Sequence, residues 1–196
     1  MSNIATTDQL FFERAGLDRQ KTETLVADAL NGADDGELYL EYEQSEALSF
    51  DDGRLKSASF DTTQGFGLRA ISGEISGYAH ASDLSEGALA RAAQTVKAVH
   101  AGHDGKLDIG PVGTNRQLYA PDNPLGLLPF EKKVKLLEEI DAYARAKDPR
   151  VRQVMCSISG SWSAIQIIRG DGSRMADVRP LVRLNISVMV EENGRM

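Results

Sequence analysis

The strongest constraint on the fold is a strict alternation of apolar and polar residues near the C-terminal end of the sequence. Apolar residues occupy every second position there: Val182, Leu184, Ile186, Val188 and Val190. A period of two residues is typical of a β-strand with one face packed in a core, so Arg183 and Asn185 are expected on its polar face. The strand runs into Asn193-Gly194, a dipeptide that predicts a hairpin turn. A hairpin needs a returning strand and only two residues follow, so we expect this sequence to be part of a longer protein.

The first hundred residues combine helical and strand patterns. A helix is expected from Asp18, which can cap its N-terminus, to Gly32, which can end it. Two-residue alternation and turn signals then indicate four strands, near residues 38–42, 55–60, 65–71 and 75–81, and a second helix follows over 85–99. This order predicts an α+β fold in which an antiparallel sheet meander is covered on one face by two helices.

A second unit is expected after an irregular stretch. Residues 101–128 show no periodicity and contain five glycines and three prolines, and structureless loops of this length are uncommon inside a compact domain. A helix from Pro129 to about Lys147 and strands up to the end then predict a helix-plus-antiparallel-sheet unit. We therefore expect an N-terminal α+β domain at 1–100, a linker at 101–128, and the start of a truncated central β-rich domain at 129–196.

Composition excludes several classes of function. With 22 basic and 29 acidic side chains the formal net charge is −7, which argues against nucleic-acid binding because that depends on neutralising phosphates. No apolar stretch approaches the roughly 18 residues of a membrane span, and the N-terminus has no secretory signal pattern. A single cysteine, Cys156, fits a reducing compartment. We therefore expect a cytoplasmic protein that binds neither nucleic acid nor membrane.

Three features could carry chemistry, and each has a structural interpretation that we favour. Residues 65–70, Gly-Phe-Gly-Leu-Arg-Ala, match the G-x-G-x-x-A dinucleotide fingerprint, but they alternate like a strand and lead into a turn rather than a helix. The glycines then serve to let a neighbouring backbone or large side chain approach closely. His100 and His103 are too few for a zinc site, which needs three or four ligands. Cys156 alternates with apolar neighbours, as expected of a buried, unreactive thiol.

Arginine is concentrated at the C-terminal end of the sequence. Residues 150–196 contain seven arginines, no lysine and four acidic residues. Arg174, Arg179 and Arg183 cluster there, with Asp177 between them. One interpretation is a sheet surface held by salt bridges. The other is recognition of carboxylates or backbone carbonyls, for which the planar guanidinium is suited.

Two long runs resemble a known family. The run from Asp61 to Glu74, DTTQGFGLRAISGE, continues through Gly77-Tyr78-Ala79, and the second run, ADVRPLVRLN, covers 176–185 and is followed by EENGR at 191–195. Both resemble the N-terminal portion of the TldD/PmbA family, and the TldD branch in particular. The resemblance implies a cytoplasmic, zinc-dependent metalloprotease, historically called a modulator of DNA gyrase. It also implies a hydrolase that works as a TldD–PmbA pair and carries out proteolysis of small unfolded peptides.

The sequence departs from the family's zinc motif, His-Glu-x-x-x-His. His80, His100 and His103 are followed by Ala81, Ala101 and Asp104, so no catalytic or metal residue can be assigned. We expect no cofactor in this chain, zinc in the full-length protein, and no peptidase activity from this chain alone.

The chain is thus interpreted as the non-catalytic N-terminal part of a TldD-like zinc-dependent metallopeptidase that processes or degrades unfolded peptides. It would supply surfaces for substrate and for a PmbA-like partner subunit or a second copy of itself as a dimer. Arg179, Arg183 and Asn185 are its predicted substrate-binding residues. The alternative is a standalone protein-interaction module without peptidase activity.

Overall fold

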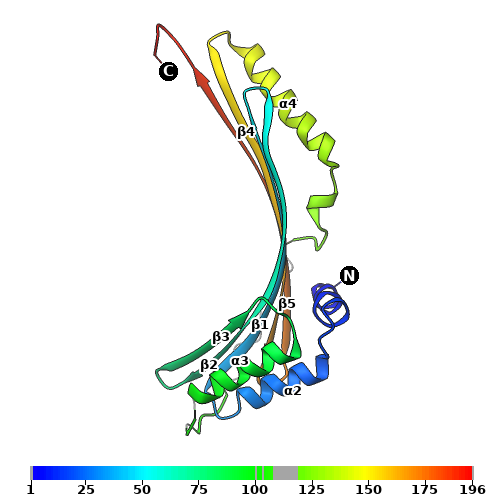
Figure 1. Cartoon of the computed structure of the whole chain (residues 1–196), viewed down its shortest axis with the longest axis vertical. Coiled ribbons are helices and arrows are strands. Elements are labelled where there is room, and N and C mark those ends of the chain that lie inside the picture. The colour runs from blue at the N-terminus through cyan, green and yellow to red at the C-terminus, as the bar shows by residue number, and fades with distance from the viewer. Residues whose placement is uncertain (1, 100, 103, 108–118, 196) are drawn as a thin grey trace. The chain divides into compact units, whose positions relative to one another are not determined.

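The computed structural model describes residues 2–99, 101–102, 104–107 and 119–195. It contains one five-stranded antiparallel sheet with strand order β3-β2-β1-β4-β5, together with helices (Figure 1). The strands are β1 (Asp35–Asp51), β2 (Arg54–Ser72), β3 (Ile75–Ala81), β4 (Val151–Arg169) and β5 (Arg174–Val190). The prediction of an α+β fold with antiparallel strands is confirmed.

Turn chemistry explains where the first strands begin and end. Between β1 and β2, Asp52 and Gly53 both have positive φ, 50° and 74°, as a two-residue hairpin turn requires. Gly73, with φ 61°, turns β2 into β3. The two strands predicted at 55–60 and 65–71 form the single strand β2. Residues 61–64, Asp-Thr-Thr-Gln, include neither glycine nor proline, and β-branched threonine favours continued extension.

The chain divides into two compact units, each made of three segments. Unit 1 consists of residues 1–43, 63–121 and 163–178, and unit 2 of residues 44–62, 122–162 and 179–196. Part of the predicted linker at 101–128 lies outside the described residues. Of the part that is described, Gly105 N–H donates to the Gly32 carbonyl at 2.9 Å, and Asn123 caps a 3-10 turn, η2 (Pro124–Gly126). The predicted domain boundaries stay a prediction.

The core of unit 1 lies between its part of the sheet and its helices. Helix α2 (Arg19–Ala29) begins at Asp18, whose carboxylate accepts the Lys21 N–H at 2.9 Å, and the chain turns at Gly32 with φ 87°. It packs beside α3 (Glu86–Val99). A short helix, α1 (Asn3–Asp8), and a π-helical turn, η1 (Gln9–Arg14), precede them. Alternate residues of β1, including Leu38 and Leu40, are fully buried, which leaves the other face of the strand away from the core.

The core of unit 2 forms under helix α4 (Phe130–Lys147). Leu137 of this helix packs with Leu48 and Phe50 of β1 and with Cys156 of β4. These contacts lie on β1 and β4, whereas β5 lies beyond β4 at the edge of the sheet.

The expectation that the apolar face of the last strand packs in a core is wrong. Val182, Leu184, Ile186, Val188 and Val190 keep 43–57% of their surface exposed. Their two-residue period correctly predicted a strand, but α4 packs over the neighbouring strands instead. The hairpin turn predicted at Asn193-Gly194 is present, with φ 51° and 76° and a bridge between Glu192 and Arg195. Among the described helices, none is both long enough and apolar enough to cross a membrane.

Candidate functional site

The three predicted substrate-binding residues lie on one face of β5. Arg179, Arg183 and Asn185 occupy odd-numbered positions of the strand, which share a face because side chains alternate. All three are exposed. Arg183 Nε donates to Asn185 Oδ1 at 3.0 Å, and Asn185 Nδ2 donates to Ser157 Oγ of β4 at 3.4 Å. Arg183 and Asn185 are thus in contact, and their side chains stand on an accessible surface.

The unit 2 part of β5, residues 179–190, is called here the β5 edge surface. Its polar face carries the predicted residues, and its other face carries the five half-exposed apolar residues. Among the strands that the structure describes, β5 has a neighbour on one side, β4. An edge strand presents backbone N–H and C=O groups that can pair with another chain. The β5 edge surface can therefore pair through its backbone with an extended segment, either the returning strand expected after Asn193-Gly194 or another chain.

Arg174, at the unit 1 end of β5, belongs to a salt-bridged surface. Its guanidinium lies 2.8 Å from the Asp8 carboxylate and 3.3 Å from that of Glu23, and its side chain is 18% exposed. The salt-bridge interpretation therefore holds for this arginine.

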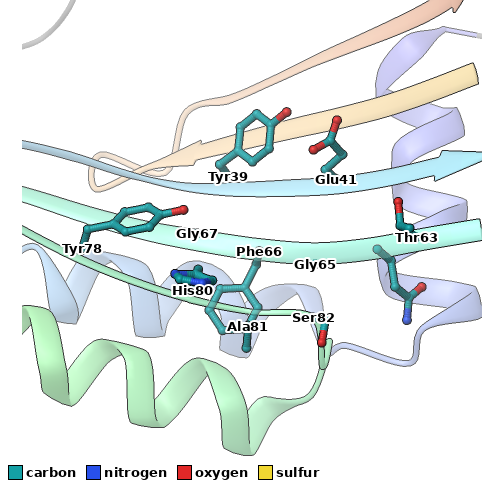
Figure 2. A pocket seen from close by; sticks show the side chains of 11 residues that line it. Tyr39, Glu41, Thr63, Gly65, Phe66, Gly67, Tyr78, His80, Ala81 and Ser82 are labelled. Carbon is teal, nitrogen blue, oxygen red and sulfur yellow. The ribbon is translucent and has the colours of Figure 1, made fainter. Parts of the chain in front are cut away.

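A hollow of about 290 Å³ lies in unit 1, on the face of the sheet that the helices leave uncovered. Figure 2 shows Tyr39 and Glu41 projecting from β1 on one side, with Tyr78 and His80 on β3 at the other. Between them runs the Gly65–Gly67 segment of β2. The hollow exists because Gly65 and Gly67 carry no side chain.

Both glycines are needed for close approach, as the sequence interpretation proposed. A Cβ at Gly67 would lie 2.6 Å from the Tyr78 hydroxyl oxygen, so the phenol lies across this residue. A Cβ at Gly65 would lie 2.8 Å from the carbonyl oxygen of Ala81. The segment is the interior of a strand and not a strand-to-helix turn, which rules out the dinucleotide fingerprint at this position.

Tyr78 and His80 form an aromatic platform beside the hollow. Their ring centroids are 5.5 Å apart with an interplanar angle of 26°. Tyr78 keeps 61% of its surface exposed. Both residues are thus exposed at the rim of the hollow, with their rings stacked on each other.

Carboxylates along the uncovered face of β1 have different partners. Glu37 pairs with Arg69 at 3.0 Å, and Asp35 pairs with Arg169 at 2.5 Å. Glu41 instead accepts a hydrogen bond from the neutral hydroxyl of Ser163 at 2.9 Å. Among the described residues, no lysine or arginine lies within ion-pair distance of it. The hollow therefore contains a carboxylate that none of the described basic side chains neutralises.

The described residues do not fit a zinc ion. Within the described ranges, no three histidine, cysteine, aspartate or glutamate side chains are placed to hold a metal. His80 stacks on Tyr78, and His100 and His103 lie outside the described residues. Cys156 is buried, its Sγ lies 3.6 Å from the Leu137 carbonyl oxygen, and burial followed by the charge of Asp141 raises the pKa of its thiol. The prediction of a buried thiol is confirmed.

Sequence reasoning missed the hollow. The signal for it was present, because Tyr39 and Glu41 alternate with buried leucines and two glycines stand two residues apart on the next strand. What the sequence analysis did not predict is the register of β3 on β2, which pairs Gly67 with His80.

Comparison with known proteins places the chain in a family. The model of the PmbA/TldA metallopeptidase domain 1 matches residues 36–100, and that of the PmbA/TldA metallopeptidase central domain matches residues 123–196. The chain belongs to the TldD/PmbA family. Its curated relatives include the metalloprotease TldD homologs of Haemophilus influenzae, 42% identical over 166 residues, and of Buchnera aphidicola subsp. Schizaphis graminum, 35% identical over 164 residues.

The chain corresponds to the N-terminal portion of TldD proteins. Each of the two alignments covers 83% of the chain but 34% of the relative, so the chain spans about a third of their length. TldE from Thermococcus kodakarensis has a similar fold, with a TM-score of 0.73 and 14% identity over 90% of this chain and 40% of that one. At this identity the likeness concerns the fold alone.

Proposed function

We propose that this chain is the non-catalytic, N-terminal part of a TldD-like zinc-dependent metallopeptidase, and that it holds unfolded peptide for cleavage. The zinc and the residues that activate water are supplied by the rest of the full-length protein. The whole enzyme acts in the cytoplasm, paired with a PmbA-like subunit or a second copy. Membership of a metallopeptidase family and the absence of His-Glu-x-x-x-His from this sequence support the division of labour.

The observation that carries the proposal is the β5 edge surface. A peptidase for unfolded chains must bind backbone more than side chains, and adding a strand to a sheet edge does so with little sequence demand. Arg183 and Asn185 add side-chain donors on one face. The half-exposed apolar residues, Val182 to Val190, can pack against alternate apolar side chains of the peptide.

The test is Arg183→Ala in the complete enzyme, assayed on an unfolded peptide substrate. If Arg183 contacts peptide, the loss of a charge-assisted hydrogen bond raises the activation free energy by about 1.5–3 kcal/mol. This lowers kcat/KM roughly 10- to 150-fold, and the melting temperature should stay unchanged. Arg152→Ala is the matched control, because Arg152 is an exposed strand arginine on β4 whose Nε pairs with Glu191 at 3.1 Å. An unchanged kcat/KM for Arg183→Ala, or a loss equal to that of the control, would refute a substrate role for Arg183.

A further inference from the structure

We infer that the hollow between Tyr39, Glu41, Tyr78 and His80 binds the guanidinium group of an arginine side chain from a peptide or protein segment. This site lies within unit 1, and the inference does not depend on the role proposed for β5. It rests on the size of the hollow, on its unneutralised carboxylate and on its aromatic platform.

The size of the hollow limits the ligand. Sites for small molecules and cofactors have volumes of about 300–1,000 Å³, and this hollow, at about 290 Å³, lies at their lower edge. It is also an open trough, floored by the backbone of Gly65 and of Gly67, with the Tyr78 phenol lying across Gly67 (Figure 2). A single long side chain fits such a trough, whereas a nucleotide does not.

The charge of the hollow selects a cation. Glu41 is half-buried, so part of its hydration has been lost, and its described partner is the neutral Ser163 hydroxyl. On the same strand, Asp35 and Glu37 already pair with arginines of the chain. A guanidinium placed at Glu41 would reproduce the pairing that Glu37 has with Arg69, with the guanidinium supplied from outside.

The aromatic rings favour a guanidinium over an ammonium. Arginine is planar, stacks on aromatic faces and donates to a carboxylate in a fixed fork, whereas a lysine ammonium is a strongly hydrated point charge. The Tyr78–His80 platform places two exposed aromatic residues beside the hollow. A cation within about 6 Å of a tyrosine ring is attracted by the negative face of the ring. The rings and the carboxylate can therefore engage one guanidinium together.

The inference is tested with N-acetyl-L-arginine amide as the probe and the 196-residue chain as the receptor. Binding is followed by NMR at the Gly67 amide and the Tyr78 and His80 rings. The neutral isostere N-acetyl-L-citrulline amide is the matched control ligand, and N-acetyl-L-lysine amide tests the choice of cation. We expect saturable shifts at these three residues with the arginine probe, at least tenfold weaker binding of the lysine probe, and none with the citrulline probe.

Two variants locate the site. Glu41→Gln should weaken binding of the arginine probe by at least about tenfold, the loss expected when a charge-assisted hydrogen bond is removed. Glu43→Gln removes the same charge two residues along the same strand, outside the hollow, and should change the affinity less than twofold. Tyr78→Ala removes an exposed ring and should also weaken binding, with the far-UV circular dichroism spectrum unchanged.

The inference is overturned if citrulline binds as well as arginine, if lysine binds as tightly as arginine, or if the shifts fall outside the hollow. Equal effects of Glu41→Gln and Glu43→Gln would also overturn it, because they would indicate general electrostatic attraction. Arg183→Ala should leave binding of this probe unchanged. A failure here is thus separate from a failure of the β5 proposal.

Discussion

Lys133 is a charged residue that is almost completely buried, and replacing it should strongly destabilise unit 2. It lies near the start of α4 with 7% of its surface exposed. Its ammonium donates to Glu46 Oε2 of β1 at 2.5 Å and to the carbonyl oxygen of Leu125 in η2 at 2.7 Å. One side chain therefore ties a helix, a strand and a turn together.

The expected fall in the free energy of unfolding follows from the groups that remain in the Lys133→Met variant. The methionine fills most of the aliphatic volume, so little packing is lost. Glu46 is left as a carboxylate whose side chain is 13% exposed, and removing one partner of a buried pair costs about 3–5 kcal/mol. Because some water still reaches Glu46, the lower end applies, and we expect the free energy of unfolding to fall by about 3 kcal/mol.

Urea unfolding followed by far-UV circular dichroism measures this change. Lys135→Met is the matched control, since Lys135 lies on the same helix with 72% of its side chain exposed and a 3.9 Å contact with Glu139, a pair worth about 0.5 kcal/mol or less. In Lys133→Met/Glu46→Gln the stranded charge is gone, so this double variant should recover about 2 kcal/mol relative to Lys133→Met. A loss below 1 kcal/mol for Lys133→Met, or no recovery in the double variant, would refute the reasoning.

Three further outcomes are expected. Hydrogen bonds from Arg150 lower the pKa of the Asp148 carboxyl group from 3.8 to about 2, so Asp148 stays ionised until the pH falls through about 2. In Arg150→Gln the NMR titration midpoint of Asp148 should rise toward 3.8. An unmoved midpoint would contradict the role given to Arg150. Burial raises the pKa of the Cys156 thiol, so a disulfide reagent should modify it only as urea unfolds the chain, and stoichiometric reaction in buffer would show that it is accessible. Leu137→Ala should lower the free energy of unfolding by about 2–5 kcal/mol, because this side chain is fully buried, and a loss below 1 kcal/mol would place it outside the core.

Local signals in the sequence predicted the elements well. The Asp18 cap depends on a side-chain carboxylate that accepts a backbone N–H, and it is present. The Gly32 stop and the turns at Asp52-Gly53 and Asn193-Gly194 depend on positive φ, which few residue types adopt, and each is present. These signals act over a few residues, so one sequence is enough to find them. Where no turn residue intervened, as at 61–64, two predicted strands proved to be one.

The burial of each face could not be predicted in the same way. Alternation in 182–190 shows that the two faces of the strand differ, but it does not say what covers the apolar one. That depends on where α4 packs, and α4 contacts β1 and β4. Lys133 is the opposite case, a charged side chain that is buried although charged residues are usually exposed. Its burial is stabilised by two tertiary partners, Glu46 and the Leu125 carbonyl.

The exposed apolar face of β5 has a physical consequence for any chain that pairs with this strand. Half-exposed valine, leucine and isoleucine gain about 25 cal/mol for each Å² of apolar surface removed from water. Each backbone hydrogen bond at an edge contributes only about 0.5–1.5 kcal/mol net, because the same groups are hydrogen-bonded to water beforehand. Affinity for an added strand should therefore depend on Leu184 and Ile186 as well as on the number of backbone hydrogen bonds. A peptide of alternating apolar residues should bind more tightly than a polar one of equal length.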